Sequence, residues 1–162
     1  MARIVLVSLA IAVLLGVAFV GCLRRDEHVA IGGEITWDDW GYRVTNVQEL
    51  TELEGGVMKP KGVFKLVTLE VLNHARRVEY DMSWHQAVLT DAHGTRYEAL
   101  TDGNRLFANR GPSKIPPGEA AHSQLLFDTP RDAALELSIV WGGDFVQKFD
   151  ALTSGERTIA LR

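Results

Sequence analysis

Residues 63–73 read VFKLVTLEVLN, and within them Val67, Leu69 and Val71 alternate with polar or charged residues. A period of two residues places successive side chains on opposite faces of an extended strand. Residues 134–141, ALELSIVW, repeat this alternation. Both stretches therefore predict strands that turn one apolar face toward a core.

Short alternating blocks continue through the chain, and no stretch past residue 25 keeps a helical period over three turns. Glycine, proline and asparagine separate the blocks, as turns between antiparallel strands require. This spacing predicts an all-β fold, an immunoglobulin-like antiparallel β-sandwich, with a closed barrel as the structural alternative. The predicted strands are residues 42–49, 63–73, 78–84, 87–90, 95–99, 121–127, 134–141, 145–150 and 157–161. The long polar connection, residues 101–113, is expected to be a loop available for binding.

The N-terminus is apolar over residues 4–21, IVLVSLAIAVLLGVAFVG, which contain no charged residue. Together with Cys22 and Leu23 the stretch reaches the roughly 20 residues that can span a bilayer. It predicts an export signal or a membrane anchor.

The end of this stretch resembles a bacterial lipobox, because Gly21 directly precedes Cys22, the only cysteine in the chain. That resemblance implies cleavage before Cys22 and a lipid on its thiol. Phe19 departs from the pattern, which usually has an aliphatic residue there. The alternative is an uncleaved transmembrane anchor in which Cys22 is a small apolar residue. Either form predicts a body held at the extracytoplasmic face of the cell membrane.

The layout that follows is a signal or anchor over residues 1–22, a linker over 23–34 and one sandwich domain over 35–162. The formal charge of −4 is spread along the chain with both signs interspersed. Without a basic stripe, nucleic acid is not an expected partner. The expected partners are the membrane, through the N-terminal segment, and another envelope protein.

The candidate ligand-binding residues are Trp37, Asp38, Asp39 and Trp40. Paired carboxylates serve acid and base chemistry on sugars, and indole rings stack on sugar rings. The competing interpretation, which we favour, is a turn whose indoles cover the core while the carboxylates face water.

No catalytic residue, metal site or cofactor is predicted. The chain has no Gly-x-Ser-x-Gly motif. His74 and His93 fall in predicted turns, with Asp91 near the second, but solvated turn histidines are favoured over a shared metal. The chain is therefore predicted not to be an enzyme.

Three stretches of the body resemble a known family. The first is residues 62–73 and the second is residues 89–97. The third combines residues 115–119 with residues 126–130. The family is an uncharacterised extracytoplasmic bacterial domain with a telokin-like immunoglobulin sandwich, related to a secreted mycobacterial immunoprotective antigen. The resemblance covers about residues 35–141 and implies an exported sandwich, with no established active site to carry over.

The expected function is that of a non-catalytic binding or interaction module at the outer face of a membrane. One alternative is a carbohydrate-binding or weakly hydrolytic accessory domain that uses the two indoles and two carboxylates. Another is a purely structural envelope domain.

Overall fold

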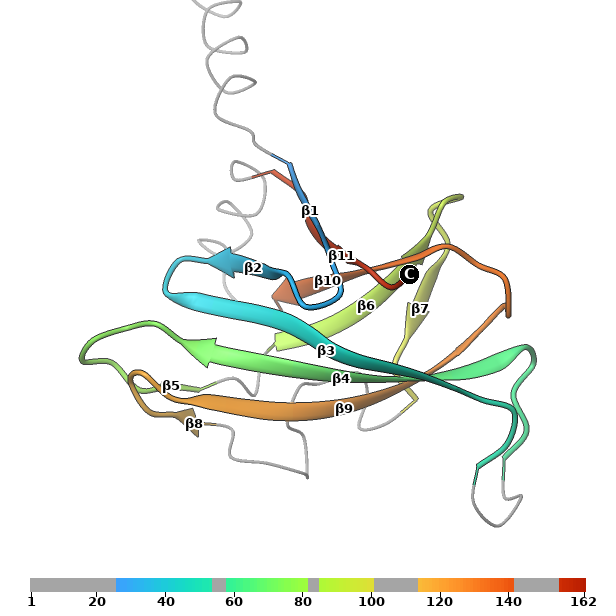
Figure 1. Cartoon of the computed structure of the whole chain (residues 1–162), viewed down its shortest axis with the longest axis horizontal. Coiled ribbons are helices and arrows are strands. Elements are labelled where there is room, and N and C mark those ends of the chain that lie inside the picture. Colours follow the sequence, from blue (N-terminus) through green and yellow to red (C-terminus); the bar gives the residue numbers. More distant parts are fainter. Residues whose placement is uncertain (1–25, 54–57, 82–84, 101–113, 142–154) are drawn as a thin grey trace, which may run out of the picture. The chain divides into compact units, whose positions relative to one another are not determined.

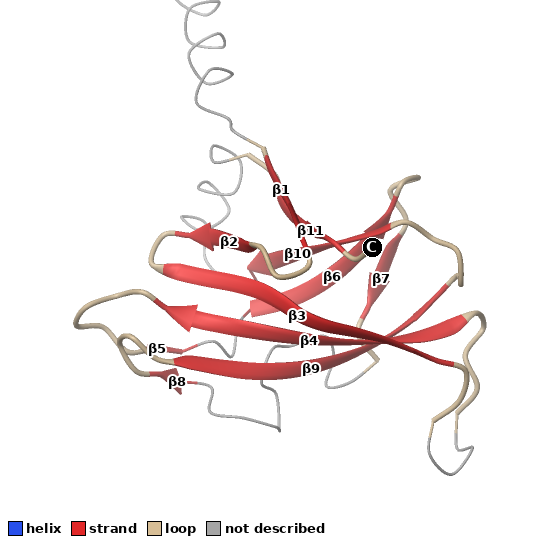
Figure 2. Ribbon diagram, in the orientation of Figure 1, coloured by secondary structure: helices blue, strands red, loops and turns tan. Residues whose placement is uncertain are grey.

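A computed structural model of the chain describes residues 26–53, 58–81, 85–100, 114–141 and 155–162. Within these ranges every regular element is a β-strand (Figures 1 and 2). The strands are β1 (Glu27–Ala30), β2 (Glu34–Trp37), β3 (Trp40–Leu50), β4 (Val63–Asn73), β5 (Tyr80–Asp81), β6 (His85–Asp91), β7 (Arg96–Glu98), β8 (Lys114–Ile115), β9 (Ala120–Thr129), β10 (Leu135–Trp141) and β11 (Arg157–Ala160).

The strands form two main sheets. One has the order β1-β11-β10-β6-β7 and the other the order β2-β3-β4-β9, while β5 and β8 make a small separate pair. Consecutive strands such as β3 and β4 pair antiparallel, with Tyr42 opposite Val71 and Val44 opposite Leu69. A bulge between Val44 and Asn46 shifts the register of that pair. The architecture is a β-sandwich, as the sequence predicts.

One hydrophobic core joins the inward faces of the two main sheets. Tyr42 and Leu69 of the four-stranded sheet share it with Leu89, Leu137 and Ile159 of the five-stranded sheet, and all five are fully buried. The alternation that predicts strand β4 is the reason for this arrangement, because Val67, Leu69 and Val71 all lie on the inward face. Burial of such side chains is the main favourable contribution to folding.

The structure also contains strands in places where the sequence pattern is weak. Strand β4 occupies the predicted residues 63–73, whereas β1, β2 and the two-residue β8 are not among the predicted strands. Strand β1 and the start of β2 lie in residues 23–34, the segment expected to be a linker. Of the predicted strand 78–84, residues 80–81 form β5, and residues 82–84 lie outside the described residues.

Contacts between residues divide the chain into two units, residues 1–27 with 144–156, and residues 28–143 with 157–162. In the described part of the first, the Glu27 N–H donates to the Glu156 carbonyl at 2.8 Å. The second unit holds the core described above. Cys22, the expected loop 101–113 and the predicted strand 145–150 lie outside the described residues. Among those that are described, no helix is long and apolar enough to cross a membrane.

Candidate functional site

The four residues predicted to bind a ligand form the β2–β3 hairpin turn. Trp37 pairs with Trp40, and Asp38 and Asp39 lie between them as the two turn residues. Asp38 has a φ of 54°, a left-handed value that aspartate tolerates better than most residues. The short turn is therefore compatible with the sequence although it has no glycine.

The two indoles belong to the core, whereas the two carboxylates are exposed. Trp37 is 9% exposed and Trp40 3%. The Arg157 guanidinium lies 4.3 Å from the centroid of the Trp37 ring and takes one of its faces. A sugar needs an open ring face for stacking, and neither indole offers one. The turn thus has the arrangement of our favoured interpretation, with indoles that cover the core.

Asn73, at the end of β4, fastens the loop that follows it. Its side-chain amide donates to the carbonyls of Val78 at 2.9 Å and Ile115 at 2.8 Å, and its side-chain oxygen accepts from the Ala75 N–H at 2.9 Å. Its backbone N–H donates to the Glu119 carbonyl at 2.9 Å. With 1% of its surface exposed, Asn73 is a buried polar residue whose amide is satisfied by main-chain groups.

Three turns come together around Asn73 at one end of the four-stranded sheet (Figure 1). They are residues 38–39, 74–79 and 116–119, and we call them the three-turn surface. The His74 N–H donates to the Asp39 carbonyl at 2.8 Å, and the Gly118 N–H donates to the Asn73 carbonyl at 2.9 Å. Backbone hydrogen bonds therefore hold the three turns in fixed positions.

The middle turn of this surface exposes two adjacent cations and an apolar side chain. Arg76 and Arg77 are both exposed, and Val78 is 49% exposed. Among the described residues neither arginine forms an ion pair, whereas the neighbouring Glu79 pairs with Lys114 at 3.6 Å. The arginine pair is thus available to a partner.

Charges on the outer face of the four-stranded sheet neutralise each other. Glu34, Arg43, Glu70 and His122 lie in one row across its four strands. Arg43 donates to a carboxylate oxygen of Glu34 and to one of Glu70, each at 2.8 Å. Because the guanidinium already holds two carboxylates, this row is a poor site for a further charged ligand.

His74 and Glu34 form a related pair at 2.6 Å, directly over Gly41. A Cβ atom at position 41 would lie 2.5 Å from a Glu34 carboxylate oxygen and 2.7 Å from His74 Nε2. A side chain at position 41 would therefore displace the Glu34 and His74 side chains from this pair. His74, one of the two histidines considered as metal ligands, is therefore paired with the Glu34 carboxylate.

The turn between β6 and β7 uses Asp91 as a structural acceptor. Its carboxylate accepts from the N–H groups of His93 and Thr95 and from the Tyr97 hydroxyl, each at 2.9 Å. Partial desolvation raises the pKa of Asp91, but the hydrogen bonds from Thr95, Tyr97 and His93 outweigh it and leave the pKa below its usual value. Across the described ranges, no group of three or more histidine, cysteine or acidic residues is placed to hold a metal ion.

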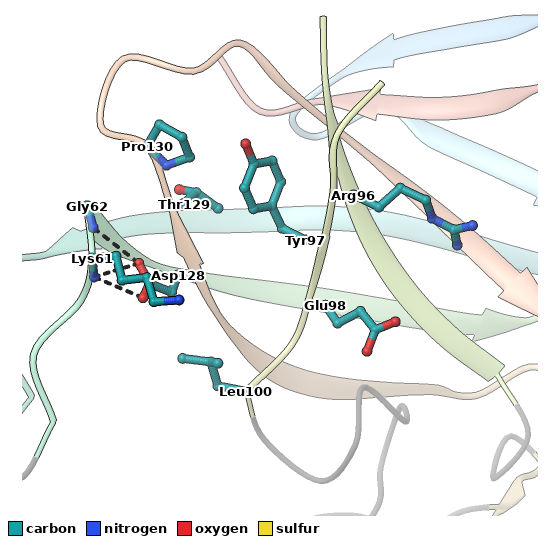
Figure 3. A pocket seen from close by; sticks show the side chains of 9 residues that line it. All are labelled: Lys61, Gly62, Arg96, Tyr97, Glu98, Leu100, Asp128, Thr129 and Pro130. Carbon is teal, nitrogen blue, oxygen red and sulfur yellow. Dashed lines mark hydrogen bonds between the residues drawn. The ribbon is translucent and has the colours of Figure 1, made fainter. Parts of the chain in front are cut away.

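An open depression of about 580 Å³ lies at the side of the sandwich (Figure 3). Its lining comes from β7, Leu100, and residues 61–62 and 128–130. The Asp128 carboxylate accepts from the Lys61 N–H at 2.9 Å and the Gly62 N–H at 3.3 Å, which ties the end of β9 to the start of β4. A Cβ atom at Gly62 would collide with the Thr129 carbonyl, so the two segments touch closely.

These features define an antiparallel β-sandwich whose turns are held by hydrogen bonds, and solved structures share that fold. The secreted protein MPT63 from Mycobacterium tuberculosis aligns with a TM-score of 0.57 at 16% identity, over 84% of this chain and 98% of that one. An uncharacterised β-sandwich protein from Clostridium difficile 630 aligns with a TM-score of 0.51 at 17% identity, over 86% of this chain and 96% of that one. The yjhA protein from Bacillus subtilis aligns with a TM-score of 0.51 at 13% identity, over 83% of this chain and 99% of that one.

Comparison of the sequence with protein-family profiles and with curated proteins gives no match. The structural likeness to a mycobacterial secreted protein confirms the resemblance noted in the sequence, at the level of the fold.

The residues that shape the three-turn surface and the depression carry little signal in the sequence. The alternating pattern predicts a strand that ends at Asn73, but it does not predict that the Asn73 side chain positions residues 74–79. Arg76 and Arg77 are adjacent in the sequence, and that was the available signal for an exposed cationic turn. The sequence pattern does not predict the depression, because its walls come from three separate segments of the chain.

Proposed function

We propose that this chain is an extracytoplasmic, membrane-anchored, non-catalytic binding module that contacts a partner protein through its three-turn surface. The observation that carries the proposal is the turn fixed by Asn73, which presents Arg76, Arg77 and Val78 to solvent. A preformed surface binds with a smaller loss of conformational entropy than a mobile one.

The chemistry of this turn suits a protein partner. Arginine is enriched in protein interfaces because its planar guanidinium binds carboxylates with two parallel hydrogen bonds. The exposed Val78 adds apolar area beside the cations. A partner surface with a carboxylate pair next to an apolar residue would complement both features.

The engagement of polar groups elsewhere supports a binding role over a catalytic one. The carboxylates of Asp91 and Asp128 accept hydrogen bonds from backbone N–H groups of neighbouring turns. Glu34 and Glu70 accept hydrogen bonds from Arg43. Groups used in this way stabilise the fold and are poorly suited to exchange protons with a substrate.

The location outside the cytoplasm rests on the N-terminus. Residues 4–21 are apolar and uncharged, and Cys22 follows Gly21 as in a lipobox. That a protein of similar fold, MPT63, is described as secreted agrees with this location.

Photo-crosslinking in intact cells tests the proposal. A photoreactive amino acid at Val78 is compared with one at Met58, which is similarly exposed, at 48%, but lies before the start of β4. We expect one discrete protein to be captured from Val78 and not from Met58. Equal capture from both positions, or none above background, would favour a purely structural domain.

A further inference from the structure

The three-turn surface carries two pairs of opposite charge on neighbouring turns. Asp38 and Asp39 are the turn residues between β2 and β3, and both are exposed. Arg76 and Arg77 are exposed in the middle turn. Within the ranges that the structure describes, none of these four side chains forms an ion pair. Each pair is therefore available to a group of opposite charge.

The backbone keeps the acidic turn and the basic turn next to each other. The His74 N–H donates to the Asp39 carbonyl at 2.8 Å, and Arg76 follows His74 by two residues. Between them, the Ala75 N–H is held by the side-chain oxygen of Asn73 at 2.9 Å. The two charge pairs thus have fixed positions before any partner binds, which lowers the entropy cost of binding.

A surface that carries both halves of a complementary contact can bind its own copy. In a twofold symmetric interface, a residue that contacts a second residue of the other copy is matched by the reverse contact. An axis between the first and the middle turn would place Asp38 and Asp39 of each copy opposite Arg76 and Arg77 of the other. Guanidinium groups bind carboxylates with two parallel hydrogen bonds, so both contacts have suitable chemistry.

Apolar side chains beside the charges add to this complementarity. Val78 follows the two arginines and is 49% exposed. Pro117, in the third turn, is also exposed. Apolar area of this kind is buried when two copies meet, and its burial is favourable. The surface therefore combines apolar area with charges of both signs.

We propose that the three-turn surface binds a second copy of this chain in a symmetric dimer, with the Asp38-Asp39 turn of each copy against the Arg76-Arg77 turn of the other. The inference rests on the proposed function, because it names the protein partner of the same surface. Exposed ion pairs are individually weak and are screened by salt, so the dimer is weak and salt-sensitive. Anchoring of both copies in one membrane would raise their effective concentration.

Sedimentation equilibrium of the full chain in density-matched detergent micelles tests the dimer. We expect its dissociation constant to rise about tenfold when the salt is raised from about 0.05 M to about 0.5 M. Arg76→Glu together with Arg77→Glu should weaken it by more than about tenfold, because repulsion replaces attraction. Lys59→Glu together with Lys61→Glu is the matched control. It changes the net charge equally before the opposite end of β4, and this variant should dimerise normally.

The reverse substitution completes the test. Asp38→Asn together with Asp39→Lys should also prevent self-association, and asparagine tolerates the φ of 54° at position 38. A mixture of the acidic and the basic variant, labelled with different fluorophores, should associate, because each contact again joins opposite charges. Association that ignores both reversals would overturn the proposal. So would a mixture that stays monomeric although circular dichroism shows both variants folded.

A photoreactive residue at Val78 needs no charge reversal and separates this inference from the proposed function. In the purified chain we expect a product of twice the chain's mass from Val78 and none from Met58, which is similarly exposed. A different protein captured in cells, with no doubled product from the purified chain, would overturn the dimer and leave the proposed function standing. No capture in either sample would contradict both.

Discussion

Asn73 links the core to the three-turn surface through one side chain. Two carbonyls and one N–H group from separate parts of the chain meet at its amide, and the residue is almost fully buried. Removing that amide leaves three main-chain groups without this partner, and the bonds to Ile115 and Ala75 are buried. Each such group costs about 1 to 3 kcal/mol, although the costs are not additive.

Asn73→Ala should therefore lower the free energy of unfolding by about 3 kcal/mol. Chemical denaturation of the full chain in detergent measures this change. Asn46→Ala is the control, because Asn46 is an exposed residue of β3, and it should change stability by less than about 0.5 kcal/mol. Equal effects of the two substitutions would show that Asn73 does not hold the loop.

Asp91 gives the fold a dependence on acid pH. Its pKa is lowered in the folded state, so the stability that it contributes is complete above the ordinary aspartate pKa of about 3.9. That contribution is lost as the pH falls through the lowered value. The Asp91→Asn variant should be less stable than the unchanged protein at about pH 6, with the difference shrinking toward about pH 3. A difference independent of pH, measured by denaturation, would contradict this role.

At the scale of elements, the β2–β3 hairpin shows how far sequence reasoning reaches. Alternation predicts β4 because Val67, Leu69 and Val71 recur at every second position within its eleven residues. Strand β2 has only four residues, and its turn Asp38-Asp39 lacks the glycine that usually announces a hairpin. The burial of Trp37 and Trp40 was not decided by the sequence, because it depends on a core completed by strands from the second sheet.

The hairpin's indoles should affect stability. Trp40→Ala removes a large buried side chain, and we expect it to lower the free energy of unfolding by about 3 to 5 kcal/mol. Asp39→Ala in the same turn should change it by less than about 0.5 kcal/mol, since the side chain is exposed. Far-ultraviolet circular dichroism during denaturation follows both variants. A Trp40→Ala protein of unchanged stability would place the indole outside the core.

For the molecule as a whole, the sequence predicts the fold but does not predict the three-turn surface. Alternation and turn residues specify strands locally, and many short strands favour a sandwich. The three-turn surface depends on which turns meet in space, and Asn73 contacts Ile115, 42 positions away in the sequence. Patterns of neighbouring residues do not contain that information.

The N-terminal anchor is tested by the mass of the whole molecule. If Cys22 is lipidated after cleavage, the intact mass of the membrane-extracted protein should equal residues 22–162 plus a lipid group. Cys22→Ala should then keep the complete N-terminus. An unchanged protein that retains residues 1–21 would establish the uncleaved anchor instead.

The most direct test of the central claim reverses the charge of the three-turn surface. Capture from a photoreactive residue at Val78 is measured in intact cells, with and without Arg76→Glu and Arg77→Glu. We predict a discrete captured protein whose yield falls by about tenfold in the charge-reversed protein. The yield should persist when Lys59 and Lys61, which precede the opposite end of β4, are replaced by glutamate. Capture that is insensitive to the arginine pair would contradict the assignment of this surface.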